Sequence, residues 1–184
     1  MELSGVQLIA IFIVSAIAGM GSVLDEFQTH RPLIACTLVG AILGDMTTGI
    51  IIGGTLEMIA LGWMNIGAAM APDAALASVI STILVIAGHQ SIGAGIAIAM
   101  PLAAAGQVLT IICRTITVFF QHKADGFAQE GNLRGIDICH LGALLLQALR
   151  VAVPSLLVAM YIGTDAVQGL LNANMGDSIT WTIE

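Results

Sequence analysis

Charged residues are scarce in this sequence of 184 residues. Only 9% of the residues are Asp, Glu, Lys or Arg, whereas 58% are hydrophobic. Soluble domains carry about 25% charged residues, so this chain lacks the charge that would cover a water-facing surface. The composition therefore argues against a soluble globular domain and indicates an integral membrane protein.

Basic residues are rarer than acidic ones. The chain has 5 Lys and Arg against 12 Asp and Glu, which gives a formal net charge of −7. Nucleic-acid-binding proteins present basic surfaces, so this balance argues against nucleic acid as a partner. The basic residues are Arg31, Arg114, Lys123, Arg134 and Arg150.

Patterns typical of redox, metal and nucleotide sites are also missing. The three cysteines have no CxxC spacing, so we expect small buried hydrophobic side chains rather than a disulfide framework. No histidine pair has metal-ligand spacing, and no GxxxxGK[ST] loop is present. We therefore expect no metal, no cofactor and no catalytic residue. The cysteines are Cys36, Cys113 and Cys139.

The apolar runs are long and do not alternate with polar residues, which excludes a membrane β-barrel. Helices are the other structure that satisfies its own backbone hydrogen bonds in lipid. Aromatic residues make up only 4% of the chain, but it contains 21 glycines, and such small residues allow close helix–helix approach. The sequence predicts an all-α, polytopic helical membrane protein with a single membrane domain over residues 1–184.

The first predicted membrane helix is Leu3–Leu24, an uncharged stretch long enough to cross about 30 Å of hydrocarbon. The residue before it is Glu2 rather than Lys or Arg, so we expect a retained helix and not a signal peptide. The polar segment Asp25–Pro32 follows as a hinge. Its last residue, Pro32, is suited to the first turn of the next helix.

A run of 40 uncharged residues separates Asp73 from Arg114 and is long enough for two crossings. We expect a division at Gly88–Gly95 and another at Pro101. The hydrophilic segment Gln121–His140 then predicts an extramembrane loop.

Lys123 and Arg134 in that hydrophilic segment weakly favour the cytoplasmic side. Gly142–Ile162 is a further predicted span, and it carries Arg150 within it.

The run GGTLEMIALGWMNIGAAMAPDAALAS is apolar but contains Glu57, Asn65 and Asp73, each eight residues apart. On one straight helix, each step of eight residues turns the side chain by about 80°, so the two carboxylates would point about 160° apart. The three polar groups cannot converge on one continuous helix.

An interrupted helix can bring these groups together. Gly62, Gly67 and Pro72 lie between them and permit a break. Irregular backbone at membrane depth is tolerated where protein buries it or where it lines a wet cavity, and transporters build midplane sites in this way. We therefore predict interrupted or re-entrant helices.

Carboxylates accept hydrogen bonds from hydroxyls, an asparagine amide donates and accepts, and Trp63 offers a flat apolar face. This combination suits a neutral polyol such as a sugar. The alternative is that Glu57 and Asp73 cap helix ends or pair with Arg114 or Arg150. Among the histidines, His30 and His89 could lie at a cavity mouth, and His122 and His140 are expected to be solvated.

Three long blocks carry a resemblance to a known family. They are GMGSVLDEFQTHRPLIACTLVGAILGD, GGTLEMIALGWMNIGAAMAPDAALAS and HQSIGAGIAIAMPLAAAGQ. These blocks closely resemble the membrane C subunit (IIC) of the mannose-family phosphotransferase system, and the similarity runs from about Met1 to Ala173.

The resemblance implies a multi-pass permease subunit of the bacterial inner membrane that takes mannose, glucose and related hexoses. It implies assembly with a IID membrane subunit and with a cytoplasmic IIB or IIAB subunit. That soluble subunit carries a phosphohistidine fed from phosphoenolpyruvate and phosphorylates the sugar, so the C subunit itself would not be an enzyme. Family members are also entry points for certain bacteriocins and for phage DNA.

Carried onto this chain, the sugar-contacting residues would be Glu57, Asn65 and Asp73, with Gln28 as a lesser candidate and Trp63 packing against the ring. The family continues through further hydrophobic spans, and NMGDSITWTIE after Ala173 departs from its pattern, so we expect a truncated or alternative product. Two other functions stay open: a transporter that does not phosphorylate its substrate, and a non-transporting assembly or receptor subunit.

Overall fold

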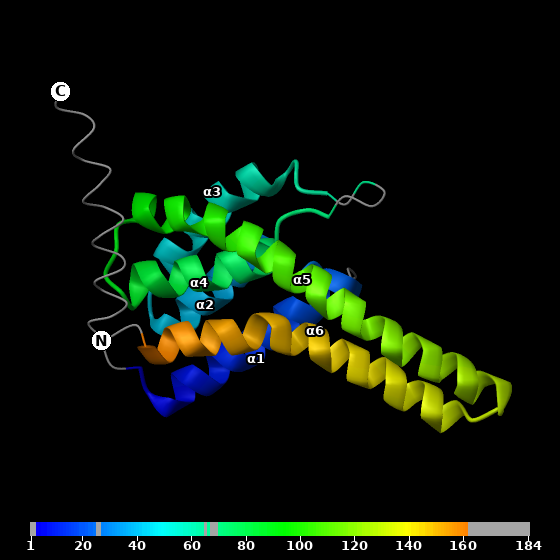
Figure 1. The fold of residues 1–184 in the computed structure, drawn as a ribbon. Helices are drawn as coiled ribbons and strands as arrows, with labels where there is room; N and C mark the ends of the chain where they lie inside the picture. Colours follow the sequence, from blue (N-terminus) through cyan, green and yellow to red (C-terminus); the bar gives the residue numbers. More distant parts are fainter. Residues whose placement is uncertain (1–2, 25–26, 65, 67–69, 162–184) are drawn as a thin grey trace.

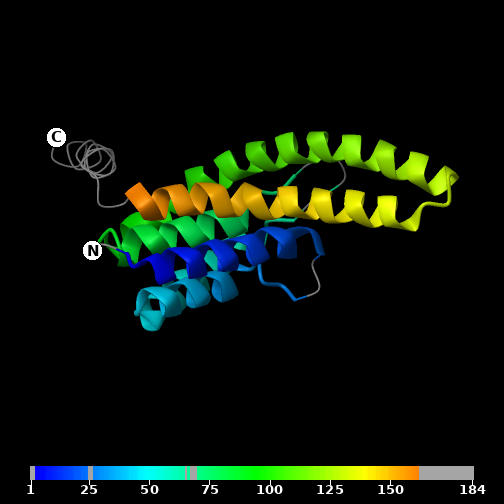
Figure 2. The ribbon, with the colours of Figure 1, turned by 90° about the horizontal axis from the view of Figure 1, so that it is seen from below.

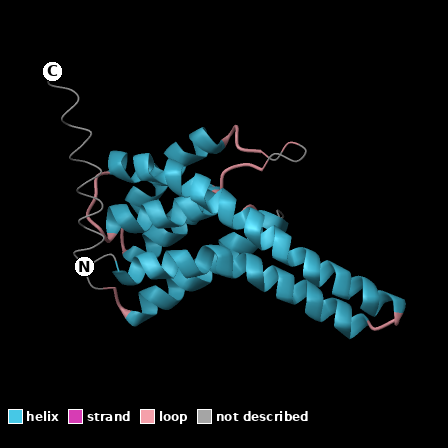
Figure 3. Ribbon diagram, in the orientation of Figure 1, coloured by secondary structure: helices cyan, strands magenta, loops and turns pink. Residues whose placement is uncertain are grey.

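The computed structural model describes residues 3–24, 27–64, 66 and 70–161. Within these residues the secondary structure is helical, as predicted, and no strand is present (Figure 3). The helices are α1 (Gly5–Leu24), α2 (Pro32–Leu43), α3 (Met46–Ala60), α4 (Ala74–Ile86), α5 (Ile92–Gln129) and α6 (Leu133–Tyr161).

The helices form a bundle from which part of one hairpin projects. Helix α1 packs along α6, α2 packs along α3, and α5 packs against both α4 and α6. The outer half of the α5–α6 hairpin extends away from the other helices (Figures 1 and 2). By length and composition, α1, α5 and α6 can each cross a membrane. The chain is therefore a multi-pass membrane protein.

Helix α4 lies at the centre of the bundle. Every residue from Ala75 to Val85 is buried, which explains why this helix carries no charged side chain on any face. Its 13 residues span about 20 Å at 1.5 Å per residue, less than the hydrocarbon core of about 30 Å. Of the two crossings expected between Asp73 and Arg114, α5 therefore has the required length and α4 does not.

Pro32 begins α2, as the sequence predicted. The helix ends at Gly44, whose φ of 90° is left-handed and is readily adopted only by glycine. The backbone N–H of Asp45 then donates to the carbonyl of Gly40 at 2.9 Å. The Asp45 carboxylate caps α3 by accepting from the Thr48 N–H at 3.0 Å. These caps fold α2 and α3 into a short helical hairpin.

The predicted division at Gly88–Gly95 is confirmed, because α4 ends at Ile86 and α5 begins at Ile92. The predicted division at Pro101 is wrong, since this residue lies inside α5. Proline removes one backbone hydrogen bond, but membrane helices tolerate the loss because neighbouring groups and local adjustments of the backbone satisfy the freed carbonyl.

The prediction that Gln121–His140 is a loop is also wrong. Only Glu130–Asn132 leaves the helices, with Gly131 at a left-handed φ of 67° and the Asn132 side chain accepting from the Gly135 N–H at 3.1 Å. The polarity of this segment reflects exposure rather than irregular backbone. The 38 residues of α5 reach about 57 Å, longer than the hydrocarbon core, and the extramembrane position of the hairpin tip stays a prediction.

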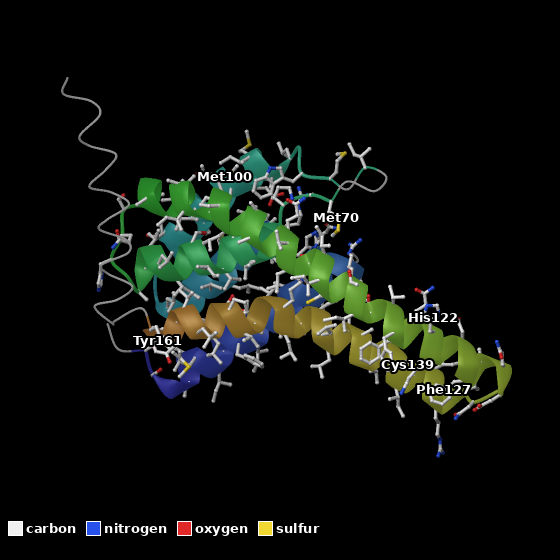
Figure 4. All side chains as sticks on the ribbon, viewed as in Figure 1. Met70, Met100, His122, Phe127, Cys139 and Tyr161 are labelled. Carbon is white, nitrogen blue, oxygen red and sulfur yellow. The ribbon has the colours of Figure 1, made fainter. Side chains whose placement is uncertain are left out.

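Small residues allow the close helix contacts that the composition suggested. A Cβ added at Gly19 of α1 would lie 2.6 Å from the Gln147 carbonyl oxygen of α6. In the hairpin, the Phe127 ring lies over Gly135, where an added Cβ would be 2.4 Å from the ring. Figure 4 shows Phe127 and Cys139 on the two arms of this hairpin. The three cysteines are free and buried, as expected.

Candidate functional site

A cavity of about 480 Å³ opens where the short helices end. Its walls come from the end of α1, the α1–α2 connection, the α3–α4 connection, the start of α4, and single turns of α5 and α6. This volume is typical of sites for small molecules, which run from about 300 to 1,000 Å³. Met70, labelled in Figure 4, belongs to the α3–α4 connection, and its carbonyl accepts from Gln107 of α5 at 2.6 Å.

Asp73 is held at the base of this connection by several hydrogen bonds. Its Oδ1 caps α4 by accepting from the Leu76 N–H at 3.2 Å, and its own N–H donates to the Ala103 carbonyl at 2.9 Å. Its Oδ2 is ion-paired with Arg150 and lies 3.3 Å from the Thr110 hydroxyl. Both carboxylate oxygens therefore already have protein partners.

Arg150 is the partner that joins the helices around the cavity. Its side chain is 2% exposed and that of Asp73 is 4% exposed, so the pair is taken out of water. The Arg150 guanidinium also donates to the Thr110 hydroxyl of α5 and to the Ser22 hydroxyl of α1, the latter at 2.8 Å. Buried charges of this kind require such additional hydrogen bonds. One residue thus connects α1, α4, α5 and α6.

Glu57 on α3 is engaged at a different helix end. It is ion-paired with Arg31, the residue before α2, and its Oε2 accepts from the Leu33 N–H at 3.2 Å. The first N–H groups of a helix have no hydrogen-bond acceptor within that helix. Glu57 of α3 therefore provides the acceptor for an N–H in the first turn of α2. The cavity is lined by Arg31 and not by Glu57.

Glu57 and Asp73 therefore both cap helix ends, which is the alternative to sugar binding that the sequence left open. That alternative is corrected in one respect, because Glu57 pairs with Arg31 rather than with Arg114 or Arg150. The predicted break is confirmed: the connection from α3 to α4 contains Gly62 and Pro72. Gly67 lies outside the described residues.

The structure brings three of the predicted sugar-binding residues to one cavity. Gln28, Trp63 and Asp73 line it, whereas Glu57 is linked to it through Arg31. Asn65 lies outside the described residues. Contact with a sugar stays a prediction for all five.

Of the two histidines expected near a cavity mouth, His30 lines this cavity and His89 lies in the α4–α5 turn, away from the cavity lining. His122 and His140 are exposed, as expected. Among the residues in the described ranges, no group of His, Cys, Asp or Glu is arranged to hold a metal ion.

Sequence reasoning missed the basic and hydroxyl side chains of the cavity. Arg31, Arg114 and Arg150 line it, together with Ser22 and Thr110. A signal was available for two of the arginines, since charged residues inside apolar segments usually face a bundle interior or a wet cavity. The two hydroxyl residues gave no such signal, because Ser and Thr are common in membrane helices.

The fold and the site define a multi-pass helical membrane protein that encloses a polar cavity at the ends of its short helices. A family model described as EII-Sor, PTS system sorbose-specific iic component, matches residues 5–182. The chain belongs to this family, and the family resemblance inferred from its sequence blocks is confirmed.

Individual relatives support the same assignment. The chain is 73% identical over 173 residues to the PTS system mannose-specific EIIC component of Escherichia coli (strain K12). It is 66% identical over 173 residues to the PTS system sorbose-specific EIIC component of Klebsiella pneumoniae. Each alignment covers 94% of this chain and 65% of the relative, so the chain spans about two thirds of the length of these proteins.

A solved structure has the same fold. It is described as a cryoEM structure of the mannose transporter ManYZ in complex with microcin E492 (MceA). The TM-score is 0.89 at 73% sequence identity, and the match covers 94% of this chain and 70% of that chain.

Proposed function

We propose that this chain is the membrane subunit of a phosphoenolpyruvate-dependent sugar phosphotransferase system. It binds and translocates mannose- and glucose-type hexoses, which a partner IIB subunit phosphorylates during uptake. The observation that carries this proposal is the 73% identity to a mannose-specific EIIC component over 94% of the chain.

The cavity supports a hexose as the ligand. Its volume of about 480 Å³ suits a small molecule, and it combines the apolar face of Trp63 with the amide of Gln28 and several charged groups. The family description and the relatives' names refer to sorbose and mannose, both of which are hexoses. A site that holds the ring by some hydroxyls can present another for phosphoryl transfer, and positioning of this kind supplies much of the rate enhancement.

The partners follow from the same argument. The solved neighbour is a transporter named ManYZ, which supports assembly of this chain with a IID-type membrane subunit. The phosphoryl group comes from a cytoplasmic IIB or IIAB subunit, so this chain performs no chemistry of its own. The proposed role is that of a transporter subunit in the bacterial inner membrane.

The test uses vesicles that contain this chain and its IID partner, supplied inside with the soluble phosphotransferase proteins. Radiolabelled mannose is added outside, with and without phosphoenolpyruvate inside. We expect uptake only with phosphoenolpyruvate, and the label inside as mannose phosphate. Free mannose accumulating inside at the same rate without phosphoenolpyruvate would contradict the proposal and favour a transporter that does not phosphorylate its substrate.

A receptor role is a second candidate, favoured by the neighbour's complex with microcin E492. In that case the chain and its IID partner would capture such a peptide without binding hexose. Pull-down with a labelled microcin, combined with a mannose-binding assay on the same sample, separates the two roles. Peptide capture without any mannose binding supports the receptor role.

A further inference from the structure

The cavity gathers most of the positive charge of the chain. Three of the 5 basic residues line it, namely Arg31, Arg114 and Arg150, although the chain carries 12 acidic residues. Among the described lining residues only Asp73 is acidic. Two of these charges are matched by carboxylates within the protein, so a ligand can add a negative charge at the third.

Two of the three arginines are already paired. Arg31 is bound to Glu57, and Arg150 is bound to Asp73. Arg114 is exposed and, within the described part of the chain, has no ion-pair partner. It lies four residues after Thr110 and therefore on the same face of α5. Arg114 is the cavity arginine whose charge stays available to a ligand.

A second, independent feature is an unpaired donor on Arg150, a residue that lines the same cavity. The Nε of Arg150 is buried and has no hydrogen-bond partner. A buried donor of this kind is costly to leave unpaired, and a ligand oxygen would satisfy it. The side chains of Arg114 and Arg150 both line the cavity.

Two helix N-termini also border the cavity. Arg31 and Pro32 at the start of α2, and Ala74 and Ala75 at the start of α4, line the same cavity. A helix N-terminus carries about +0.5 of an elementary charge and favours bound phosphate. Carboxylates already interact with both ends, since Asp73 caps α4 and Glu57 accepts from the Leu33 N–H of α2, so the positive charge left for a ligand is that of Arg114.

We propose that Arg114, together with the Nε of Arg150, forms a phosphoryl-binding corner of this cavity. Its ligand is a phosphoryl group: the phosphate ester of the newly phosphorylated hexose before release, or the phosphoryl group on the histidine of the donor subunit. Guanidinium groups bind phosphate oxygens through paired N–H donors. The hexose part of this inference rests on the proposed function.

The position of Arg114 along α5 suits this role. It lies 22 residues after the helix begins at Ile92, which is about 33 Å along the axis and close to the thickness of the hydrocarbon core. If α5 enters the hydrocarbon core at Ile92, this distance brings Arg114 to the opposite membrane–water boundary, where a soluble phosphoryl donor can reach it.

The experiment is isothermal titration of the full 184-residue chain, in lipid nanodiscs with its IID partner, with mannose, mannose 6-phosphate and inorganic phosphate. We expect mannose 6-phosphate to bind about tenfold more tightly than mannose, and this advantage to shrink with added salt. Inorganic phosphate bound as tightly as mannose 6-phosphate would support the donor group as the occupant. Weaker but measurable binding of inorganic phosphate would support the phosphorylated sugar.

Substitutions at Arg114 test whether the preference for mannose 6-phosphate arises in the cavity. Arg114→Gln should abolish the preference for mannose 6-phosphate over mannose, and Arg114→Lys should retain part of it. Arg134→Gln is the matched control, because Arg134 is an exposed arginine of α6 outside the cavity lining, and it should leave the preference unchanged. Since Arg114 is exposed, these substitutions should not disturb folding, which circular dichroism checks.

Equal affinity for mannose and mannose 6-phosphate in the wild type would overturn the inference, as would a preference that survives in Arg114→Gln. Failure of the proposed function has a different signature. In that case phosphoenolpyruvate-dependent mannose uptake is absent from the vesicles, while phosphate can still bind at Arg114. Normal uptake with no phosphate preference means that the transport proposal stands and the phosphoryl corner does not.

Discussion

Arg150 on α6 forms a buried ion pair with Asp73, the residue that caps α4, across 77 residues of sequence. The pair lies in the wall of the cavity and also engages Thr110 of α5 and Ser22 of α1 through Arg150. It therefore fixes the position of the broken α3–α4 segment relative to the two long helices. Any movement of that segment must carry Arg150 with it or break the pair.

The first prediction concerns the strength of this pair. Asp73→Ala leaves the Arg150 charge buried without its partner, and removal of one partner of a buried pair costs about 3–5 kcal/mol. The double variant Asp73→Ala with Arg150→Met removes the orphaned charge and should be more stable than the single variant. Thermal unfolding in detergent, followed by circular dichroism, gives the comparison. A single variant as stable as wild type would show that the pair does not hold the bundle together.

The second prediction separates stability from transport at Glu57. Its side chain is 20% exposed and that of its partner Arg31 is 35% exposed. Loss of this partly exposed pair in Glu57→Gln should therefore lower the free energy of unfolding by no more than about 1 kcal/mol. If the carboxylate takes part in sugar binding, mannose uptake should fall by much more than the loss of folded protein explains. Uptake in vesicles at matched protein amounts is the measurement. Unchanged uptake in both Glu57→Gln and Asp73→Asn would remove these two residues from the predicted sugar site.

The third prediction concerns the space beside Asp73. A Cβ added at Gly106 of α5 would lie 2.6 Å from the Asp73 Cβ and 3.0 Å from Leu76 Cδ2. Gly106→Ala should therefore displace the start of α4 and cost about 1–3 kcal/mol, with weaker mannose binding. The control is Gly93→Ala in the same helix, where an added Cβ meets nothing within 4 Å. Equal behaviour of the two variants would contradict the close packing between α5 and Asp73.

The fourth prediction concerns the projecting hairpin. Gly135→Ala would place a Cβ 2.4 Å from the Phe127 ring, so we expect destabilisation of about 1–3 kcal/mol. In a Phe127→Ala background the same change should have little effect, because the clashing ring is gone. Gly126→Ala, with nothing within 4 Å of the added Cβ, should be neutral or stabilising. Thermal unfolding and the rate of proteolysis between Glu130 and Asn132 report on the hairpin.

The fifth prediction uses the two tryptophans of the chain. In a Trp181→Phe background, Trp63 is the remaining tryptophan and lines the cavity. If its ring packs against the sugar, mannose should change its fluorescence in a saturable way. Trp63→Phe should preserve most of the mannose affinity, whereas Trp63→Ala should lower it. A Trp63→Ala variant that binds mannose normally would make Trp63 a packing residue, consistent with its position beside the buried cluster that contains Leu56.

Much of the fold could be predicted from the sequence. The scarcity of charge and the long apolar runs predicted a helical membrane protein, and Pro32 and the segment Gly88–Gly95 located two helix boundaries correctly. These features act locally, because a residue without an N–H or with a flexible backbone favours a helix boundary through its own conformation. The same local reasoning failed at Pro101, because neighbouring groups within a membrane bundle can compensate for a lost backbone hydrogen bond.

The loop prediction for the hydrophilic segment was wrong for a different reason. The polarity of Gln121–His140 predicts a loop, yet its residues continue α5 and begin α6. Polarity indicates contact with water, and a helix that projects beyond the bundle satisfies that condition while keeping its backbone hydrogen bonds. Composition alone does not distinguish an exposed helix from a loop.

The sequence by itself determined that Glu57 and Asp73 could not meet on one straight helix, since the angular spacing of residues on a helix is fixed by backbone geometry. It also predicted the break between them, because Gly62 and Pro72 permit one. It also determined the family, through long matched blocks. Only the tertiary structure decided which arginine meets which carboxylate, and that Arg114 is left without a described partner. Those pairings join residues 26 and 77 positions apart in sequence, and they depend on how helices pack, which no local pattern encodes.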